Sequence, residues 1–344
     1  MLSILVPHPI HHNNRELKEI WNDELAQKIR QSVLDGTYEY CSKEFCPSLN
    51  TLLNTDIIPS NFIEKSKLPY NYSDIEISNY TIENSAVIEQ TPGEINFTFD
   101  KSCNLKCPSC RSQQIMASGE EVEKINNTLD YIEQHFSKNI RKIFITGSGD
   151  PFASRSFRRF LKNFDKEKFK DLNLIHLSTN GNLFTPEAWD EIKNSREFIK
   201  ICEISIDAAT KDTYENKVRL NGEWDKLMKN LKFIIELDSI QFLRFSFVVQ
   251  QKNYKEIVPF IEMIYHLSKK RIEKFGEWST VIYFSKIDDW YVMDNETFNE
   301  NAVWKKTHKE YYKFIEEIQK IKNFSNKIKI QTNFNDLINK KLLL

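Results

Sequence analysis

The chain has 344 residues, with 48 lysines and arginines against 49 aspartates and glutamates, so its formal net charge at pH 7 is −1. Because positive and negative charges balance, the chain has no electrostatic preference for nucleic acid or for a membrane surface. Neither a nucleic acid nor a membrane is therefore expected as a partner. A hydrophobic fraction of 40% is enough to bury a core, and the length suits one large α/β domain with an appendage.

The first residues, MLSILVPHPIHHNN, lack a basic segment followed by a long apolar run, so no signal peptide is expected. No stretch of the chain approaches the ~20 apolar residues that a membrane span needs. The expected location is therefore the cytoplasm, where clustered cysteines indicate metal or redox chemistry rather than disulfides. Three early histidines are expected to lie in a disordered terminus: His8, His11 and His12.

Residues 1–90 differ from the rest of the chain and are predicted to form an irregular N-terminal appendage. Its clearest element is one helix over residues 16–36, in which apolar residues recur at helical spacing and Gly36 stands at the end. The polar stretch that follows contains two cysteines, Cys41 and Cys46.

From residue 94 onward, predicted strands and helices alternate. The predicted strands cover 94–100, 142–146, 174–178, 200–206, 243–249 and 279–285. The predicted helices cover 118–136, 157–164, a segment from 185, 223–237, a segment from 257, and a long segment around 300–322. A capping box of Ser118 and Glu121 is expected to begin the first of these helices, and Thr185 with Pro186 to begin the third.

Six strand–helix units in series predict an α/β fold with a parallel sheet, arranged as a partial (β/α)6 TIM-like barrel. The barrel is predicted over residues 91–295, and a helical C-terminal extension over 296–344. In such sheets, chemistry takes place in the loops that follow the carboxyl ends of the strands. Four loops rich in polar and small residues fall at these ends: 103–110, 147–151, 178–181 and 205–208.

The first of these loops reads CNLKCPSC and spaces Cys103, Cys107 and Cys110 as C-x3-C-x2-C. A structural zinc site needs four ligands, and the loop has neither a fourth cysteine nor a histidine. A redox pair of Cys107 and Cys110 would leave Cys103 unexplained. A 4Fe–4S cluster usually takes four cysteines, so three would leave one iron open to a substrate or cofactor.

This spacing, in the loop after the first strand of a β/α barrel, resembles the radical S-adenosylmethionine (SAM) superfamily over about residues 94–290. The resemblance implies that the three cysteines hold a 4Fe–4S cluster. The loop GSGDP is similar to the family's Gly-Gly-Glu-Pro loop, whose backbone binds the amino group of SAM. The resemblance implies SAM contacts at Gly147, Ser148, Gly149, Asp150, Pro151, Ser178, Asn180, Ser205, Asp207, Arg219 and Val249.

Some of these positions have implied roles within the SAM site. Arg219 resembles a basic residue that meets the SAM carboxylate, and the run 247–253 resembles a stretch whose backbone passes the adenine. Two positions depart from the family pattern: Ser109 replaces an aromatic residue that often precedes the third cysteine, and Asp150 replaces the more common glutamate. Neither departure removes an iron ligand.

By this resemblance the chain is an enzyme in which one electron from the cluster cleaves SAM to methionine and a 5′-deoxyadenosyl radical, which abstracts hydrogen from a substrate. An external electron donor such as a flavodoxin or ferredoxin is implied. The favoured substrate is a peptide, and no residue is assigned as the catalytic acid, base or quencher of the product radical. The alternatives are a sugar or other small metabolite, an RNA, or a non-catalytic metal-binding module.

The segment 20–47 resembles part of the SPASM/twitch class, whose members bind auxiliary iron–sulfur clusters and often act on ribosomally made peptides. This resemblance is the reason for favouring a peptide. The segment is truncated, because the further cysteines that usually precede it are missing. Cys41 and Cys46 alone supply too few ligands, so an auxiliary cluster is less favoured than a packed remnant.

Several other features have a functional and a structural interpretation. The segment 155–170 carries seven basic and two acidic residues, which favours a solvated helix face over an RNA-binding surface. Asp288, Asp289 and Trp290 follow the sixth strand and would line either a substrate pocket or a plain loop. Glu203 would titrate high if it points inward, and Cys202 is expected to be a buried apolar residue.

Overall fold

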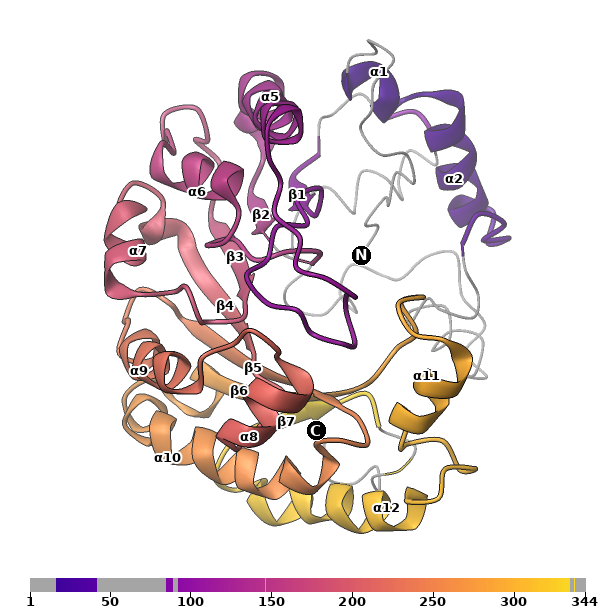
Figure 1. Cartoon of the computed structure of the whole chain (residues 1–344). Helices are drawn as coiled ribbons and strands as arrows, with labels where there is room; N and C mark the ends of the chain where they lie inside the picture. Colours follow the sequence, from indigo (N-terminus) through magenta and orange to yellow (C-terminus); the bar gives the residue numbers. More distant parts are fainter. Residues whose placement is uncertain (1–16, 42–84, 89–91, 146, 335–336, 338–344) are drawn as a thin grey trace. The chain divides into compact units, whose positions relative to one another are not determined.

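The computed structural model describes residues 17–41, 85–88, 92–145, 147–334 and 337 (Figure 1). The chain divides into two compact units, Met1–Gly93 and Glu94–Leu344. Cys46 and the three early histidines lie outside the described residues. No helix among the described residues combines the length and the apolar composition needed to cross a bilayer.

The described residues of the first unit form two short helices, α1 (Leu17–Trp21) and α2 (Glu24–Leu34), where one continuous helix was predicted. The prediction is wrong at Asp23, which has extended backbone dihedrals and caps α2. Its Oδ1 accepts a hydrogen bond from the backbone N–H of Ala26 at 2.7 Å. Aspartate favours this capping position over a helix interior, so the helical pattern is interrupted although its apolar spacing continues.

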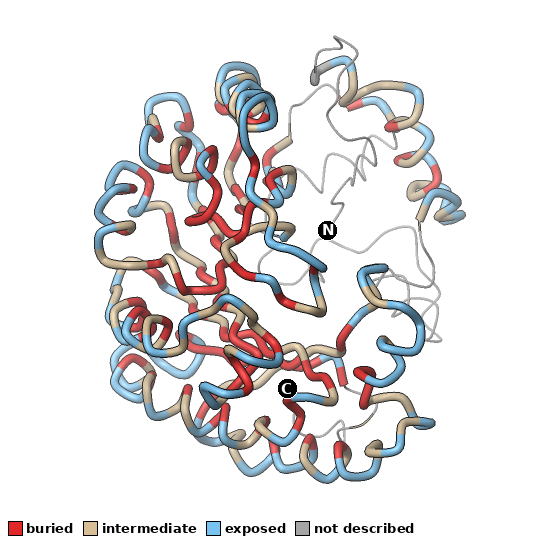
Figure 2. Tube along the Cα trace, viewed as in Figure 1, coloured by how far each residue is buried: buried red, intermediate tan, exposed pale blue. Residues whose placement is uncertain are grey.

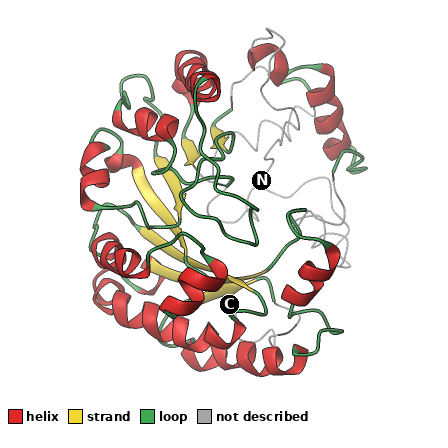
Figure 3. Ribbon diagram, in the orientation of Figure 1, coloured by secondary structure: helices red, strands yellow, loops and turns green. Residues whose placement is uncertain are grey.

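The second unit is built on seven strands that pair in parallel in chain order, from β1 to β7 (Figure 3). This arrangement confirms the predicted α/β fold with a parallel sheet. The strands are β1 (Glu94–Phe97), β2 (Lys142–Ile145), β3 (Leu174–Thr179), β4 (Ile199–Ser205), β5 (Phe242–Val249), β6 (Thr280–Lys286) and β7 (Lys329–Thr332).

The seventh strand lies in the segment that was predicted to be a helical extension. The sequence KIKIQT over 327–332 alternates polar and apolar residues, which is a strand period. Strand β7 pairs with β6 from Val281↔Lys329 to Phe284↔Thr332. The single long helix expected around 300–322 is instead two helices, α11 (Asn295–Asn301) and α12 (Tyr311–Gln319).

Helices follow the strands, and most of them lie along the outer side of the sheet (Figure 1). They are α5 (Glu120–His135), α6 (Arg155–Lys162), α7 (Pro186–Glu191), α8 (Lys211–Thr213), α9 (Trp224–Ile235) and α10 (Ile257–Phe275), with α11 and α12 after β6. One π-helical turn, η5 (Tyr214–Val218), and short 3-10 turns complete the connections: η3 (Ser137–Asn139), η4 (Arg196–Phe198), η6 (Tyr254–Glu256), η7 (Glu277–Ser279) and η8 (Lys320–Phe324).

The helix starts show which capping predictions were correct. Thr185 caps α7 as predicted, accepting a hydrogen bond from the N–H of Ala188 at 3.2 Å. The capping box predicted for α5 is wrong, because that helix begins at Glu120 and its N-cap is Gly119, with φ 52° and no side-chain cap. A positive φ suits glycine, so the chain reverses there before the helix begins.

The core lies between the sheet and these helices, where buried residues follow the strands (Figure 2). Alternate strand residues are completely buried and apolar, including Leu177, Ile204, Phe245 and Phe284. Cys202 belongs to this set and is fully buried, as predicted. On the other face of the middle strands, several polar side chains are half-buried, so this face is partly open: His176, Ser178, Glu203, Ser205 and Arg244.

Candidate functional site

The cysteine loop follows β1 and is held by its own backbone. The N–H of Cys103 donates to the carbonyl of Ile115 at 2.8 Å, which closes the loop at its base. The N–H groups of Cys110 and Arg111 both donate to the carbonyl of Cys107, at 2.9 and 3.0 Å. Cys103 and Cys107 are buried and Cys110 is exposed. The loop therefore places three thiols at the carboxyl end of β1 with little backbone freedom.

Asp150 joins the loops that follow the first three strands. Its N–H donates to the carbonyl of Ser102 at 2.8 Å. Its carboxylate accepts hydrogen bonds from the hydroxyl of Thr179 and the N–H of Asn180, both at 2.8 Å, and also from two N–H groups of its own turn. Burial raises the pKa of Asp150, and these hydrogen bonds oppose that shift. The side chain is thus fully engaged in holding the loops together.

Gly149 lies where this loop passes closest to the cysteine loop. A Cβ atom added at Gly149 would lie 2.6 Å from the carbonyl oxygens of both Asp100 and Ser102. Gly147 has φ 101°, which is a conformation that side chains disfavour. Gly149 is therefore required by the close approach of backbone atoms, and Gly147 is required by its own backbone conformation, whatever ligand the loop binds.

Replacing Gly149 with alanine is expected to lower the free energy of unfolding by about 1–3 kcal/mol, because the Cβ would collide with backbone atoms rather than with a movable side chain. Urea denaturation measures this loss. Gly119→Ala gives the comparison, since no atom lies within 4 Å of its added Cβ and only the strain of its backbone, at φ 52° and ψ −126°, about 1–3 kcal/mol, applies. A loss at Gly149 below about 0.5 kcal/mol would contradict the close approach.

Arg111 is a site residue that the sequence analysis missed. It is buried and donates to the carbonyls of Lys101 and Ser148, at 2.9 and 2.6 Å. Its other contact is with the Sγ of Cys110, at 3.5 Å. The signal that could have revealed it is a basic residue directly after the third cysteine, because a guanidinium stabilises a nearby thiolate.

Arg219 and Asp207 form a buried ion pair at 2.8 Å beside the cysteine loop. Arg219 also donates from Nη1 to the Sγ of Cys107 at 3.4 Å. Asp207 has φ 63° and accepts from the N–H of Val248 at 2.7 Å, so it joins the loops after β4 and β5. Burial opposes the charge of Arg219, but Asp207 and Cys107 raise its pKa overall. Both residues were predicted to contact SAM; here they bond to each other.

The remaining predicted SAM contacts lie on the same edge of the sheet. Asn180 is buried, with its Nδ2 2.9 Å from Oδ1 of Asn104 and 3.7 Å from the Sγ of Cys103. Ser178 and Ser205 are half-buried on the open face of the sheet, whereas the side chain of Val249 is completely buried. Only the backbone of Val249 is therefore available to a ligand. Pro151 is buried, Ser148 is half-buried and Gly147 is exposed.

The donor chemistry of this loop fits a cluster bound by three cysteines. Each thiol has one polar contact outside the loop's backbone: Asn180 for Cys103, Arg219 for Cys107 and Arg111 for Cys110. Burial raises the pKa of the Cys103 thiol to about 11, so it is protonated at neutral pH. No group of three or more His, Cys, Asp or Glu side chains in the described part of the chain is arranged to hold a metal ion. Binding of iron by the three cysteines would replace these polar contacts of their thiols. The cluster itself stays a prediction.

The open face of the sheet carries ionisable side chains in its middle strands. His176 on β3 has a buried Nε2 without a hydrogen-bond partner, and its ring centroid lies 5.4 Å from that of Phe144. Burial lowers the pKa of His176, with Glu203 opposing that shift. Glu203 points to this face, is half-buried and pairs with Arg244 at 3.4 Å.

Replacing His176 with glutamine should reduce the loss of stability on acidification. Because the pKa of His176 is lower in the folded state, the unfolded chain binds a proton first as the pH falls below about 6.5. This group therefore lowers the free energy of unfolding by up to about 1.4 kcal/mol per pH unit in that window. Urea denaturation at pH 7 and 5.5 tests this, with His266→Gln, an exposed site on α10, as control. Identical pH dependence in the parent and His176→Gln would refute it.

Other predicted features lie in exposed positions. Asp288 and Trp290 are exposed after β6, and Asp289 accepts from the N–H of Tyr291 at 2.8 Å. In the basic segment 155–170, Arg158 pairs with Glu191, and Arg159 pairs with Asp130 at 2.5 Å. These pairs agree with a solvated helix face. Cys41 is half-buried and free.

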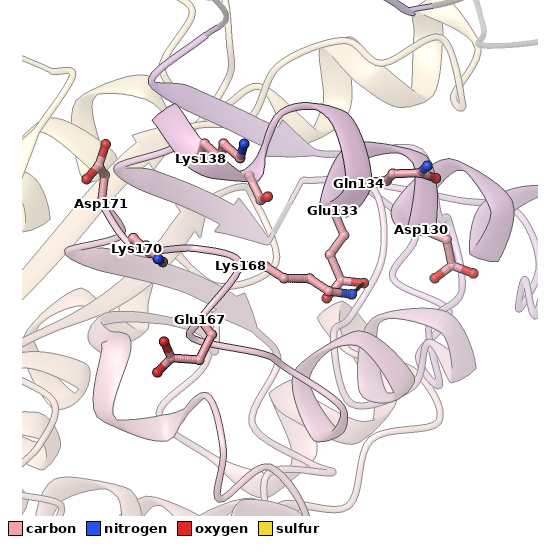
Figure 4. Close-up of a pocket in the computed structure, with 9 residues that line it drawn as sticks. Asp130, Glu133, Gln134, Lys138, Glu167, Lys168, Lys170 and Asp171 are labelled. Carbon is pink, nitrogen blue, oxygen red and sulfur yellow. Dashed lines mark ion pairs between the residues drawn. The ribbon is translucent and has the colours of Figure 1, made fainter.

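A surface pocket of about 800 Å³ lies away from these loops (Figure 4). Its charged walls come from α5, η3 and the segment before β3, and Lys168 pairs there with Glu133 at 3.4 Å. Ser137, Lys138, Lys170 and Asp171 place it near the amino ends of β2 and β3. It is therefore at the opposite edge of the sheet from the cysteine loop.

Comparison with known proteins agrees with the motifs. Residues 99–264, just under half of the chain, match the family model of the Radical SAM superfamily, so this segment carries a radical SAM domain. This match confirms the expectation that the chain contains a domain of an enzyme family. Molybdenum cofactor biosynthesis protein 1 of Dictyostelium discoideum is 22% identical over 207 residues, which are 60% of this chain and 31% of that protein. The chain thus spans about a third of the length of this relative.

Solved structures with similar folds were also found. SuiB of Streptococcus suis bound to S-adenosylmethionine is 14% identical, with a TM-score of 0.47, covering 75% of this chain and 53% of that one. SuiB bound to precursor peptide SuiA is 15% identical, with a TM-score of 0.46, covering 90% and 62%. Native anSMEcpe with bound AdoMet and Cp18Cys peptide is 18% identical, with a TM-score of 0.45, covering 71% and 63%. The SPASM/twitch subgroup stays a prediction.

Proposed function

We propose that this chain is a radical SAM enzyme, in which Cys103, Cys107 and Cys110 hold a 4Fe–4S cluster and SAM is cleaved reductively. One observation supports this proposal above the others. The C-x3-C-x2-C loop, with the adjoining Arg111, lies inside the matched segment and is hydrogen-bonded to the segments after β2, β3 and β4 at the carboxyl edge of the sheet. When bound, the cluster would supply one electron and an open iron position.

The protein's own residues would fix the geometry around that position. Asp150 and Arg111 hold the cysteine loop against GSGDP, which leaves backbone groups of that loop free to bind the amino group of SAM. Arg219 places a buried positive charge beside Cys107, where it would stabilise a thiolate ligand. Arg219 would reach a SAM carboxylate with its remaining donors while Asp207 holds it in place.

The substrate and partners belong to the same proposal. A peptide is the favoured substrate because the segment 20–47 resembles the SPASM/twitch class, and an external flavodoxin or ferredoxin would supply the electron. An auxiliary cluster at Cys41 and Cys46 is less favoured, because the two cysteines provide only half of the usual ligands. The cytoplasm is the proposed location, because iron–sulfur chemistry and free thiols both suit a reducing compartment.

Anaerobic reconstitution with iron and sulfide tests the cluster directly. The proposal expects about four irons and four sulfides per chain and a brown protein with charge-transfer absorption. A protein that takes up zinc instead, and no iron, would support the non-catalytic metal-binding alternative and contradict the proposal. Co-purified RNA with strongly salt-dependent binding would point to an RNA substrate in place of a peptide.

A further inference from the structure

The open face of the sheet presents ordered rows of polar side chains below the cysteine loop. In a parallel sheet, paired residues point to the same face. The strand register aligns Ser178, Glu203 and Arg244 in one row across β3, β4 and β5. The next row toward the carboxyl edge contains Ser205, Ser246 and Tyr283. The rows are two residues apart, or about 7 Å.

Both carboxylate oxygens of Glu203 already accept a hydrogen bond within the protein. Its Oε1 accepts from the hydroxyl of Ser246, and its Oε2 accepts from Nη1 of Arg244 at 3.4 Å. The side chains of Glu203 and Arg244 are 19% and 31% exposed, so the pair lies below the surface but within reach of the open face. The carboxylate therefore orients the guanidinium, and its own negative charge disfavours direct contact with an anionic group.

Arg244, in contrast, has unused donors. Its Nε is buried and has no hydrogen-bond partner among the described residues, and Nη1 makes one long bond to Glu203. The rings of Phe242 and Tyr283 have centroids 5.8 and 5.4 Å from the guanidinium carbon, so they restrict its position. A buried guanidinium donor without an acceptor costs free energy, which a ligand oxygen would recover.

We infer that Arg244 binds a carboxylate group of the substrate on the open face of the sheet, with Glu203 as its positioning residue. This inference rests on the proposed function, since it places the substrate below the predicted SAM site. The planar fork of a guanidinium matches the two oxygens of a carboxylate, and partial burial strengthens that bond. A peptide would supply such a group from its C-terminus or from an acidic side chain.

Protection of Arg244 from phenylglyoxal tests this inference in the reconstituted protein with saturating SAM and no reductant. The modified arginines are identified by mass spectrometry. N-acetylglycine is the carboxylate probe, and N-acetylglycinamide is its matched neutral control. Arg158, whose side chain is 42% exposed in a surface ion pair, is the control residue.

The inference expects saturating N-acetylglycine to slow modification of Arg244 by at least about fivefold, with little effect of the amide and none at Arg158. Equal protection by the amide, or no protection, would overturn it. Protection by inorganic phosphate but not by N-acetylglycine would also overturn it. If SAM alone protects Arg244 fully, the residue belongs to the SAM site and the inference fails. Because no SAM cleavage is measured, failure here is separate from failure of the proposed function.

Discussion

Replacing Cys107 with alanine should lower the formation of 5′-deoxyadenosine from SAM by at least about 100-fold. Losing a residue that merely supports a metal ligand commonly costs 10–100-fold, so losing a ligand should cost more. Cys107 is buried and accepts a hydrogen bond from Arg219 at 3.4 Å, so its thiol is held in place within the loop. The measurement is product formation by anaerobically reconstituted protein with SAM and dithionite.

Cys202→Ala is the matched control for this experiment. Cys202 is equally buried but lies within β4, on the face that packs against the helices. Its replacement should cost about 1 kcal/mol of stability and leave product formation in place. Unchanged product formation in Cys107→Ala, or equal losses in both variants, would contradict the assignment of the cysteine loop.

Replacing Arg219 with leucine should lower the free energy of unfolding by about 3–5 kcal/mol, because Asp207 would remain buried without its partner. Burial already raises the pKa of Asp207, and Arg219 opposes that shift. The double variant with Asp207→Asn should recover part of the loss, since an amide is cheaper to bury than an unpaired charge and its Oδ1 can still accept from Val248.

Urea denaturation of the single and double variants measures both effects. The exposed ion pair of Lys211 and Asp225, 2.6 Å apart, gives the comparison, since Lys211→Met should barely move the denaturation midpoint. Additive losses in the double variant, instead of recovery, would show that Asp207 and Arg219 do not act as a pair.

The sheet could be predicted from the sequence because its strands are short apolar runs between clear helical patterns. The six predicted strands all exist, with ends that differ by a few residues. The predictions failed where local chemistry overrides periodicity. Asp23 breaks a helix whose apolar spacing continues through it, and Gly119 rather than Ser118 begins α5. Strand β7 was missed because its segment follows a helical pattern.

The site was predicted in part. The cysteines and the small-residue loops could be found because their spacing is constrained by the chemistry they serve. Arg111 was missed although it directly follows the third cysteine. Its contact with Ser148 and the pairing of Asp207 with Arg219 could not be found, because they depend on how the loops come together. Asp150 shows the same limit: a loop motif identified it, but only the structure shows that its carboxylate and its backbone N–H together join three loops.

The central claim is tested most directly by incubating the anaerobically reconstituted protein with SAM and dithionite and measuring 5′-deoxyadenosine and methionine by mass spectrometry. The proposed function predicts that both products form together in equal amounts, even without the natural substrate, and that neither forms when iron is omitted. A protein that contains its cluster and binds SAM, but forms neither product, would contradict it.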